Sequence, residues 1–211
     1  MGRPRHPPRT ADDLLDAAER LIETDGIGAL SVRRVAEAAG TTTRAVYSLY
    51  GSKDGLVAAL GRRAFELLGE GIARVPETDD PAGDLVGAGL TVFRRFATDH
   101  PSLFRVAVQR TAPGPGYATI EGFQTEAREA WGGLEERVRR LEIAGLLGGR
   151  LSFDAAIEFH ALCEGLAALE LRGMLPAGRE EAYWRDALGA LVHGFADSPA
   201  EERASLRGIR G

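Results

Sequence analysis

The sequence predicts an all-α protein of about nine helices arranged in two domains. Apolar residues recur at steps of three or four along most of the 211 residues, and no segment has the strict alternation of a half-buried strand. Ser, Thr, Gly and Pro stand where these periodic segments begin and end. We expect a small helical domain with a basic N-terminal arm over residues 1–54 and a larger helical domain over residues 55–211.

The first expected helix covers residues 10–24. Thr10 stands at its N-cap, Asp13 at the capping-box position, and Gly26 just past its end. Its apolar stripe, which should face a core, consists of Leu14, Leu15, Ala18, Leu21 and Ile22.

Residues 31–56 have the spacing of a helix-turn-helix. Ala36 is small enough for two helices to cross closely, and Gly40 can take the positive φ of a tight turn. Val46 supplies an apolar contact from the second helix back to the first. Side-chain oxygens stand where each helix needs an N-cap, at Ser31 and Thr42.

Three residues that follow the turn carry groups able to bind phosphate: Tyr47, Tyr50 and Lys53. A tyrosine hydroxyl and a lysine ammonium both donate hydrogen bonds to phosphate oxygens, and Lys53 is the single lysine of the chain. Their positions are those at which a helix lying in the major groove would meet the flanking DNA backbone.

This segment resembles the N-terminal domain of the TetR family of bacterial transcriptional regulators. The resemblance rests on the Gly40 turn, the Ala45-Val46-Tyr47 step, Tyr50, and Ser52-Lys53 followed by Leu56. Two positions depart from the family pattern. Thr41 stands where the family usually has Val, and Leu49 where it often has His or Tyr, which puts a backbone contact at residue 49 in doubt.

The remaining periodicity predicts six further helices. The first, over residues 53–74, joins the two domains, and Pro76 and Pro81 bound the loop that follows. The long fourth one could kink at Gly132-Gly133, and Ser152 is expected to cap the fifth. The last five helices are expected over residues 82–99, 101–110, 117–147, 152–172 and 180–196.

Composition favours a protein without a membrane segment or a metal site. Hydrophobic residues make up 44% of the chain, but no apolar run approaches the roughly 20 residues that span a bilayer. The N-terminus has positive charge without a following apolar segment, so it is not a secretory signal. A lone cysteine, Cys163, excludes an intrachain disulfide and a Cys-rich zinc site. We expect a cytoplasmic protein with no cofactor and no membrane partner.

The net charge of −5 is unevenly distributed. Residues 76–211 carry 15 basic and 21 acidic side chains. The negative excess of this part is therefore larger than the net charge of the whole chain. The local field at the helix-turn-helix matters more for DNA than the total charge. Basic side chains gather in the arm and around the turn, at Arg3, Arg5, His6, Arg9, Arg33, Arg34, Arg44 and Lys53.

The resemblance implies an N-terminal three-helix DNA-binding domain and a C-terminal helical domain for ligand binding and dimerisation. The expected function is a sequence-specific transcriptional regulator, a repressor that a largely apolar small-molecule effector releases from a palindromic operator in double-stranded DNA. Whether it represses or activates depends on where the operator lies. Expected base-reading residues are Arg33, Thr43 and Arg44; expected phosphate contacts are Thr42, Tyr47, Tyr50 and Lys53, with Arg3, Arg5 and Arg9 of the arm.

The final expected helix carries an apolar face assigned to a homodimer interface: Trp184, Leu188, Leu191, Val192 and Phe195. In the resembled family, the last two helices pair with their symmetry mates in a four-helix bundle. The alternative is that this stripe faces the core of its own chain. The dimer is favoured because a solitary helix-turn-helix reads only a half-site.

Candidate effector-pocket residues lie on the middle helices: Phe93, Phe96, Phe104, Val108, Phe123, Trp131, Phe159, His160, Cys163 and Glu164. For each apolar candidate taken singly, a position in the ordinary hydrophobic core is the simpler interpretation. His160 and Glu164 share one helical face, where they could contact a ligand or simply bond to each other.

Two other classes of function compete with a transcriptional regulator. An enzyme lacks support because the sequence has no Ser-His-Asp set, phosphate loop or metal cluster. A non-specific architectural DNA-binding protein of the same fold is the main alternative. The acidic C-terminal part and the scarcity of lysine argue against it.

Overall fold

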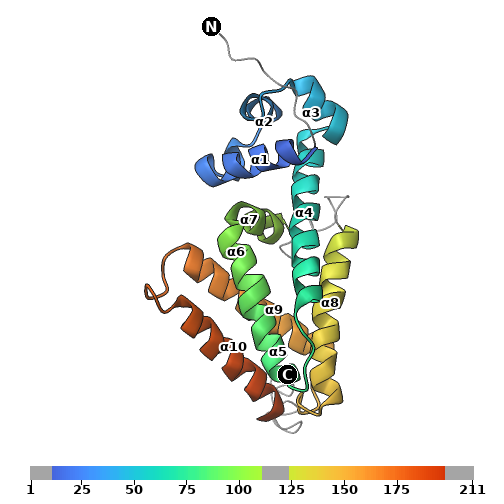
Figure 1. The fold of residues 1–211 in the computed structure, drawn as a ribbon, viewed down its shortest axis with the longest axis vertical. Helices are drawn as coiled ribbons and strands as arrows, with labels where there is room; N and C mark the ends of the chain where they lie inside the picture. Colours follow the sequence, from blue (N-terminus) through green and yellow to red (C-terminus); the bar gives the residue numbers. More distant parts are fainter. Residues whose placement is uncertain (1–10, 111–123, 198–211) are drawn as a thin grey trace, which may run out of the picture. The chain divides into compact units, whose positions relative to one another are not determined.

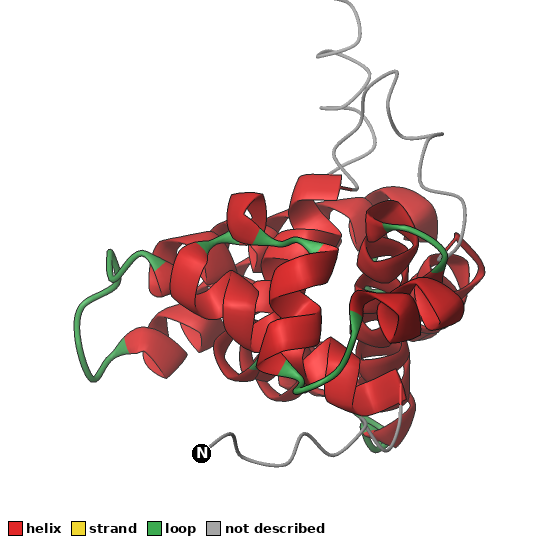
Figure 2. Ribbon diagram, turned by 90° about the horizontal axis from the view of Figure 1, so that it is seen from above, coloured by secondary structure: helices red, strands yellow, loops and turns green. Residues whose placement is uncertain are grey.

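The computed structural model describes residues 11–110 and 124–197, and all regular structure in these ranges is helical (Figure 2). The all-α prediction is therefore confirmed. None of the helices in these ranges is long and apolar enough to cross a bilayer. The predicted arm residues, the Thr10 cap and Phe123 lie outside the described residues.

Two compact units divide the chain. The first comprises Met1–Leu67 and His100–Ala127, and the second comprises Leu68–Asp99 and Arg128–Gly211. This division differs from the expected boundary after residue 54, because residues 53–67 of helix α4 (Lys53–Arg74) and the segment His100–Ala127 group with the N-terminal helices. α4 starts at the residue that the sequence predicted and continues from the first unit into the second (Figure 1).

In the first unit, α1 (Ala11–Asp25) packs against a short 3-10 turn η1 (Ile27–Ala29), α2 (Val32–Ala38) and α7 (Pro101–Arg110). α3 (Thr43–Tyr50) packs on α2. Arg63 of α4 binds α1, with its Nη1 2.6 Å from Asp16 Oδ1 and 3.2 Å from Glu19 Oε1. The core of the first unit includes Leu14, Ile22, Leu30, Val35, Val46, Leu56 and Leu60.

The second unit consists of the end of α4, α5 (Pro81–Ala88), η2 (Gly89–Arg94), α6 (Arg95–Asp99), most of α8 (Gln124–Ile143), α9 (Ser152–Leu171) and α10 (Glu180–Asp197). α10 packs against α5, η2 and α9. The largest fully buried side chains of this unit are Trp184, Phe159, Phe195, Leu85, Leu134 and Leu141.

The predicted helix over residues 82–99 is interrupted by a π-helical segment. The helical path is continuous, but residues 89–94 form the wider π turns of η2 between α5 and α6. Gly89 allows η2 to approach its neighbours, since a Cβ there would lie 2.4 Å from Leu188 Cδ1. Hydrophobic periodicity cannot distinguish such a segment from ordinary α-helix, so the sequence did not predict it.

Two helix ends also differ from the prediction. α8 ends at Ile143 instead of residue 147, because Gly145 takes φ +72° and the Leu146 N–H bonds to the Leu141 carbonyl at 2.8 Å. Ser152 is the first helical residue of α9 and not its cap. Leu151 is the extended N-cap residue, and no side chain caps this helix.

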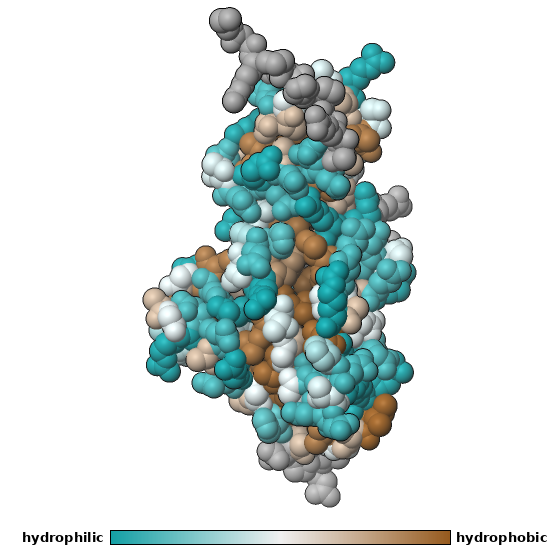
Figure 3. Space-filling view, viewed as in Figure 1, coloured by the Kyte–Doolittle hydropathy of each residue, from teal (hydrophilic) through white to brown (hydrophobic). Residues whose placement is uncertain are grey.

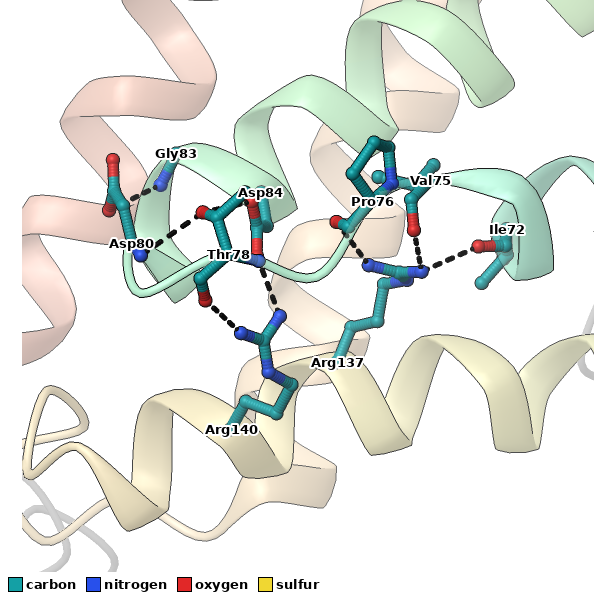
Figure 4. A network of polar contacts seen from close by, with 9 residues as sticks. All are labelled: Ile72, Val75, Pro76, Thr78, Asp80, Gly83, Asp84, Arg137 and Arg140. Carbon is teal, nitrogen blue, oxygen red and sulfur yellow. Dashed lines mark hydrogen bonds and ion pairs between the residues drawn. The ribbon is translucent and has the colours of Figure 1, made fainter.

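Two arginines of α8 hold the chain between α4 and α5 (Figure 4). Arg137 is buried, and its guanidinium donates to the carbonyls of Ile72 at 2.8 Å, Pro76 at 3.3 Å and Val75. These carbonyls belong to the last turn of α4 and the residues after it, where backbone donors run short, although the Ile72 carbonyl also accepts from the Val75 N–H at 3.2 Å. A positive charge is also favoured at the negative end of the helix dipole. Arg137 therefore caps α4 with a side chain from another helix.

The second arginine, Arg140, binds the carboxylate of Asp84 in the first turn of α5. Its Nη1 donates to Asp84 Oδ2 at 2.6 Å, and its other terminal nitrogen donates to the Thr78 carbonyl. Asp84 also accepts from the Thr78 N–H at 2.7 Å and hydroxyl at 2.8 Å. Burial tends to raise the pKa of Asp84, but the hydrogen bonds from Thr78 and Arg140 outweigh it and lower that pKa.

Candidate functional site

The turn between α2 and α3 has the geometry that its sequence predicts. Gly40 adopts φ +69°, and the Thr41 N–H bonds back to the Ala36 carbonyl at 2.8 Å. Both predicted caps are present: Ser31 Oγ accepts from the Arg34 N–H and Thr42 Oγ1 accepts from the Ala45 N–H, each at 3.3 Å. Ala36 and Val46 are buried, so α3 is held on α2 by the face that carries Val46.

The opposite face of α3 is exposed. Thr43 and Arg44 lie in its first turn with their side chains in solvent, and Tyr47 follows one turn later with 53% of its surface exposed. Leu49, which departs from the family pattern, is 54% exposed. A short helix with polar, cationic and aromatic groups on its free face can enter a major groove and meet base edges there.

The two arginines that begin α2 differ in their availability. Arg33 is exposed, with only a 4.0 Å ion pair to Glu37 on the same helix. Arg34 is held within the chain, because its guanidinium binds the Asp25 carboxylate and donates to the Ala29 carbonyl at 3.4 Å. Of the two, Arg33 is therefore the one with an exposed and only weakly paired guanidinium to offer a base.

Three of the predicted phosphate-binding residues are exposed: Thr42, Tyr47 and Lys53. The Thr42 oxygen accepts the cap hydrogen bond, which leaves its hydroxyl proton free to donate to phosphate. Lys53 lies in the first turn of α4, which directly follows α3.

Tyr50 has a role inside the chain that the sequence analysis did not foresee. Its hydroxyl donates to the carbonyl of Ala11 at 2.7 Å and so ties the end of α3 to the start of α1. Burial raises the pKa of Tyr50, and the nearby Asp12 carboxylate adds to this. The hydroxyl therefore keeps its proton, but that proton is already used in a bond within the protein.

The sequence analysis missed Gly55, which shapes the start of α4. The Gly55 N–H donates to Ser52 Oγ at 2.9 Å, so Ser52 caps the helix that carries Lys53. A Cβ on residue 55 would lie 1.9 Å from the Tyr50 carbonyl oxygen. The signal was a glycine inside an otherwise regular helical pattern, which often marks a close backbone approach.

A second candidate site is a cluster of aromatic rings in the second unit, which we call the α9 aromatic cluster: Phe93, Trp131, Phe153, Phe159 and His160. The His160 ring meets Phe93 at 5.7 Å and Trp131 at 5.6 Å between centroids, both edge to face. Phe93 also meets Phe159 at 6.2 Å, and Trp131 meets Phe153 at 6.0 Å. Phe153 was not among the predicted pocket residues because nothing in its own sequence neighbourhood indicates contact with α8.

The predicted pair of His160 and Glu164 is bonded across one turn of α9. His160 Nε2 lies 3.0 Å from Glu164 Oε1, and both side chains are about one-third exposed. The other ring nitrogen, Nδ1, is buried and has no hydrogen-bond partner in the described part of the chain. Nε2 of His160 is therefore paired with the carboxylate, whereas Nδ1, on the other side of the ring, has no hydrogen-bond partner among the described residues.

The other predicted pocket residues are divided between the two units. Cys163 and Phe96 are buried in the second unit, and burial raises the pKa of the Cys163 thiol well above its usual range. Phe104 belongs to α7 in the first unit, as does Val108, whose side chain is not described. The sequence alone could not separate these groups, because every candidate has the same helical periodicity.

The dimer assignment on α10 requires a correction. Trp184, Leu188 and Phe195 are fully buried within one chain and Val192 is 3% exposed, so these four face the core of their own unit. Trp184 Nε1 donates to Glu170 Oε2 at 2.7 Å, and the Arg150 guanidinium lies over the Phe195 ring at 5.3 Å. Leu191 alone of the predicted set keeps partial exposure.

A different apolar surface remains open on the last two helices. On α9, Ile157 is 45% exposed and the small residues Ala161 and Gly165 follow it at four-residue steps in solvent. On α10, Tyr183 is 40% exposed, and Ala190 and Gly194 are exposed. We call these six residues the α9–α10 outer face.

Two family models match most of the described chain. The model described as "Bacterial regulatory proteins, tetR family" matches residues 14–60, which include the helix-turn-helix. The model described as "Tetracyclin repressor-like, C-terminal domain" matches residues 86–195, more than half of the chain. The protein therefore has the fold class of a helix-turn-helix regulator with a helical C-terminal domain, and it belongs to the TetR family of bacterial regulatory proteins.

Individual relatives agree with this membership. Uncharacterised HTH-type transcriptional regulators from two strains of Mycobacterium tuberculosis are each 31% identical over 94 residues. That match covers 44% of this chain and 46% of each relative, so the chain spans less than half of their length. Both relatives are described as transcriptional regulators.

Solved structures show the same fold at lower identity. A protein of unknown function from a Rhodococcus species superposes with a TM-score of 0.76 at 23% identity, over 92% of this chain and 100% of that one. The TetR family transcriptional regulator PfmR from Thermus thermophilus gives a TM-score of 0.65 at 20% identity, over 85% and 96% of the two chains.

Proposed function

We propose that this protein is a sequence-specific DNA-binding transcriptional regulator that acts as a homodimer. We further propose that it is a repressor and that a small-molecule effector releases it from a palindromic operator. The observation that carries the proposal is the free face of α3, where Thr43, Arg44 and Tyr47 are exposed on a helix held rigidly by the Gly40 turn and the buried Val46.

Base reading is assigned to Arg44 and Thr43 on α3, with Arg33 at the start of α2. The Arg44 guanidinium can donate two parallel hydrogen bonds to a guanine edge, which discriminates against other bases by about 1–3 kcal/mol. Thr43 can bond to a base or contact a thymine methyl group. All three side chains are exposed on the first turns of their helices, where base contacts of this motif are made.

Positioning on the DNA backbone is assigned to Thr42, Tyr47 and Lys53, with Arg3, Arg5 and Arg9 of the N-terminal arm. Hydroxyl and ammonium donors on either side of α3 would hold both flanks of the groove. Tyr50 could take the same role only by giving up its 2.7 Å bond to Ala11. We therefore assign Tyr50 to holding α3 against α1.

Dimerisation is assigned to the α9–α10 outer face. Two long helices with exposed apolar and small residues can pack closely against the same pair in a second chain. The dimer would place two copies of α3 in successive major grooves, about 34–36 Å apart, on an inverted repeat. The buried stripe of α10, on another side of the helix, packs into the core of its own unit and so holds this surface in place.

Effector binding is assigned to the second unit, around the α9 aromatic cluster. An effector can change operator affinity only as far as it binds the DNA-competent and DNA-incompetent dimers differently. A ligand among rings from η2, α8 and α9 would touch three elements at once, so a change in their packing would alter its affinity.

The test is selection from random duplex DNA by the purified full-length protein at about 150 mM salt, followed by sequencing. The expected result is an enriched inverted repeat whose half-sites lie one helical turn apart. Salt-sensitive binding with no enriched sequence would contradict the proposal and favour an architectural protein instead. A single enriched half-site would contradict the homodimer.

A further inference from the structure

We propose that Tyr50 is a positioning residue for the N-terminal arm, although its hydroxyl does not touch DNA. The bond from that hydroxyl to the Ala11 carbonyl fixes the place where the arm joins α1, at the end of the helix that reads the bases. The arginines of the arm, Arg9 above all, then reach the DNA backbone from a set starting point. This role rests on the proposed function, because it takes DNA as the partner of both α3 and the arm.

Tyr50 is held in a well-defined backbone frame at the end of α3. Its carbonyl accepts from the Ser52 N–H at 2.7 Å. The next residue, Gly51, takes φ +71°, and its N–H bonds to the Tyr47 carbonyl at 2.8 Å. The Tyr50 ring is half-buried, which limits the freedom of the side chain. The 2.7 Å bond to Ala11 therefore ties α1 to a fixed point.

The Ala11 carbonyl does not need this bond to be satisfied. Ala11 is the first residue of α1, and carbonyls in the first turn of a helix accept from N–H groups four residues further along. The Tyr50 hydroxyl uses the second lone pair of that oxygen. Because Ala11 is exposed, water can replace the hydroxyl in its absence. The bond thus restrains the position of Ala11 more than it stabilises the fold.

The acidic start of α1 opposes a close approach to DNA. Asp12 and Asp13 follow Ala11 in the first turn of α1, and both are exposed. Hydrophilic side chains cover most of α1 on the face shown in Figure 3. Carboxylates repel phosphates, so an untied start of α1 would move away from the DNA backbone. The bond to Tyr50 opposes this movement and keeps the base of the arm close to α3.

Chain length makes Arg9 the arginine that depends most on this bond. Arg9 precedes Ala11 by two residues, so their Cα atoms lie at most about 7 Å apart. Arg3 precedes Ala11 by eight residues, and an extended chain of that length spans up to about 28 Å. A shift of Ala11 by a few ångströms therefore changes what Arg9 can reach and changes little for Arg3. The energetic coupling to Tyr50 should fall from Arg9 to Arg3.

The test is a double-mutant cycle on the affinity of the full-length protein for its selected inverted repeat at about 150 mM salt. Tyr50→Phe keeps the ring and removes only the hydroxyl. In the wild-type background we expect it to weaken binding about three- to tenfold, the worth of one hydrogen bond. In the Arg9→Ala background the same change should weaken binding less than about twofold, because the contact that it positions is already gone.

Two matched controls separate this role from a direct contact and from a general effect of the arm. Tyr47→Phe removes a hydroxyl about one turn earlier on the same helix, but that hydroxyl is assigned to phosphate itself. Its effect should be the same with and without Arg9. Arg3→Ala removes an arm arginine far along the chain from Ala11, and in this background Tyr50→Phe should keep most of its effect.

Three results would overturn the inference. Tyr50→Phe could bind with wild-type affinity, or it could lose as much affinity without Arg9 as with it, in which case the hydroxyl would act through α3 alone. The third result is a large drop in the urea midpoint of Tyr50→Phe, which would make the bond structural. We expect that midpoint to stay close to the wild-type value.

Failure of this inference is distinguishable from failure of the proposed function. Phosphate contacts of the arm need no particular sequence, so the same cycle is also measured on a scrambled duplex at about 50 mM salt. A protein that selects an inverted repeat but shows no coupling between Tyr50 and Arg9 would keep the proposed function and lose this inference. Coupling without any selected sequence would keep the role of Tyr50 and contradict sequence-specific regulation.

Discussion

At the residue scale, base reading and phosphate binding are assigned to different side chains that lie close together in the chain. Arg44 and Thr43 stand on the free face of α3, whereas Lys53 begins α4, the next helix. The two roles have different energetic signatures, because base contacts depend on sequence and phosphate contacts depend on salt. Substitutions at the two positions should therefore fail in different ways.

Arg44→Ala should relax the sequence preference at one position of each half-site. The loss of a bidentate contact to guanine should cost about 1–3 kcal/mol on the selected operator and little on random DNA. Competition binding against a panel of single-base operator variants measures this. Equal losses on operator and random duplexes would show that Arg44 does not read a base.

Lys53→Ala should weaken binding to all sequences alike. Each lost phosphate contact should reduce the slope of log affinity against log salt by about 0.9. The slope is obtained from titrations between about 50 and 200 mM salt. An unchanged slope combined with altered sequence preference would contradict the role assigned to Lys53.

Gly55→Ala should destabilise the first unit. A Cβ 1.9 Å from the Tyr50 carbonyl oxygen must displace backbone, so we expect a loss of about 2–3 kcal/mol in the free energy of unfolding. Gly132→Ala is the matched control, because it is an exposed helical glycine with nothing within 4 Å of its Cβ position. The control should be neutral or stabilising by up to about 1 kcal/mol. Equal effects of the two changes in urea unfolding would refute the clash.

At the scale of elements, the end of α4 depends on α8. Gly133 of α8 lets Ile72 of α4 approach, since a Cβ there would lie 3.3 Å from Ile72 Cγ2. Arg137, one turn further along, caps three carbonyls at the end of α4. α8 also contributes Trp131 to the α9 aromatic cluster. One helix thus connects the proposed effector site to the helix that continues into the DNA-reading unit.

Arg137→Leu should lower the free energy of unfolding by about 2–3 kcal/mol, because it removes the hydrogen bonds that Arg137 donates to the carbonyls of Ile72, Val75 and Pro76. Arg139→Leu changes the same residue type on the same helix, but Arg139 is exposed and its partner is Glu136. The control should shift stability by less than about 0.5 kcal/mol. Urea unfolding of both variants decides the point, and a loss from Arg139→Leu as large as that from Arg137→Leu would contradict the capping role.

Local elements were predictable from sequence, whereas contacts between distant elements were not. The Gly40 turn, both of its caps and the start of α4 depend on residues within a few positions of each other, and each prediction is confirmed. The bond between His160 and Glu164 follows from the same local geometry. The cap from Arg137 and the contact of Phe153 with Trp131 depend on which helices pack together, and no sequence periodicity contains that information.

The stripe on α10 illustrates the same limit. Its apolar spacing correctly indicated a helix with a buried face. The spacing could not indicate what covers that face, and Trp184, Leu188, Val192 and Phe195 are covered by their own chain. The proposed interface instead uses small and partly exposed residues that carry a weaker hydrophobic signal.

At the scale of the whole molecule, the proposal requires two chains. Ala161→Glu would place a charge in the middle of the α9–α10 outer face, and a carboxylate without a partner in an apolar interface should dissociate the dimer. Ala182→Glu adds the same charge to an exposed alanine about 100° around α10 from Tyr183. Sedimentation equilibrium should report a monomer for the first variant and a dimer for the second. A dimer in both would exclude this face as the interface.

The central claim is that this protein distinguishes one DNA sequence from others. The most direct measurement is the ratio of its affinities for the selected inverted repeat and for a scrambled duplex of equal length and composition, at about 150 mM salt. We expect a ratio of about 10³ or more, as for specific regulators in general. A ratio near one would contradict it, since the free face of α3 would then bind DNA without reading it.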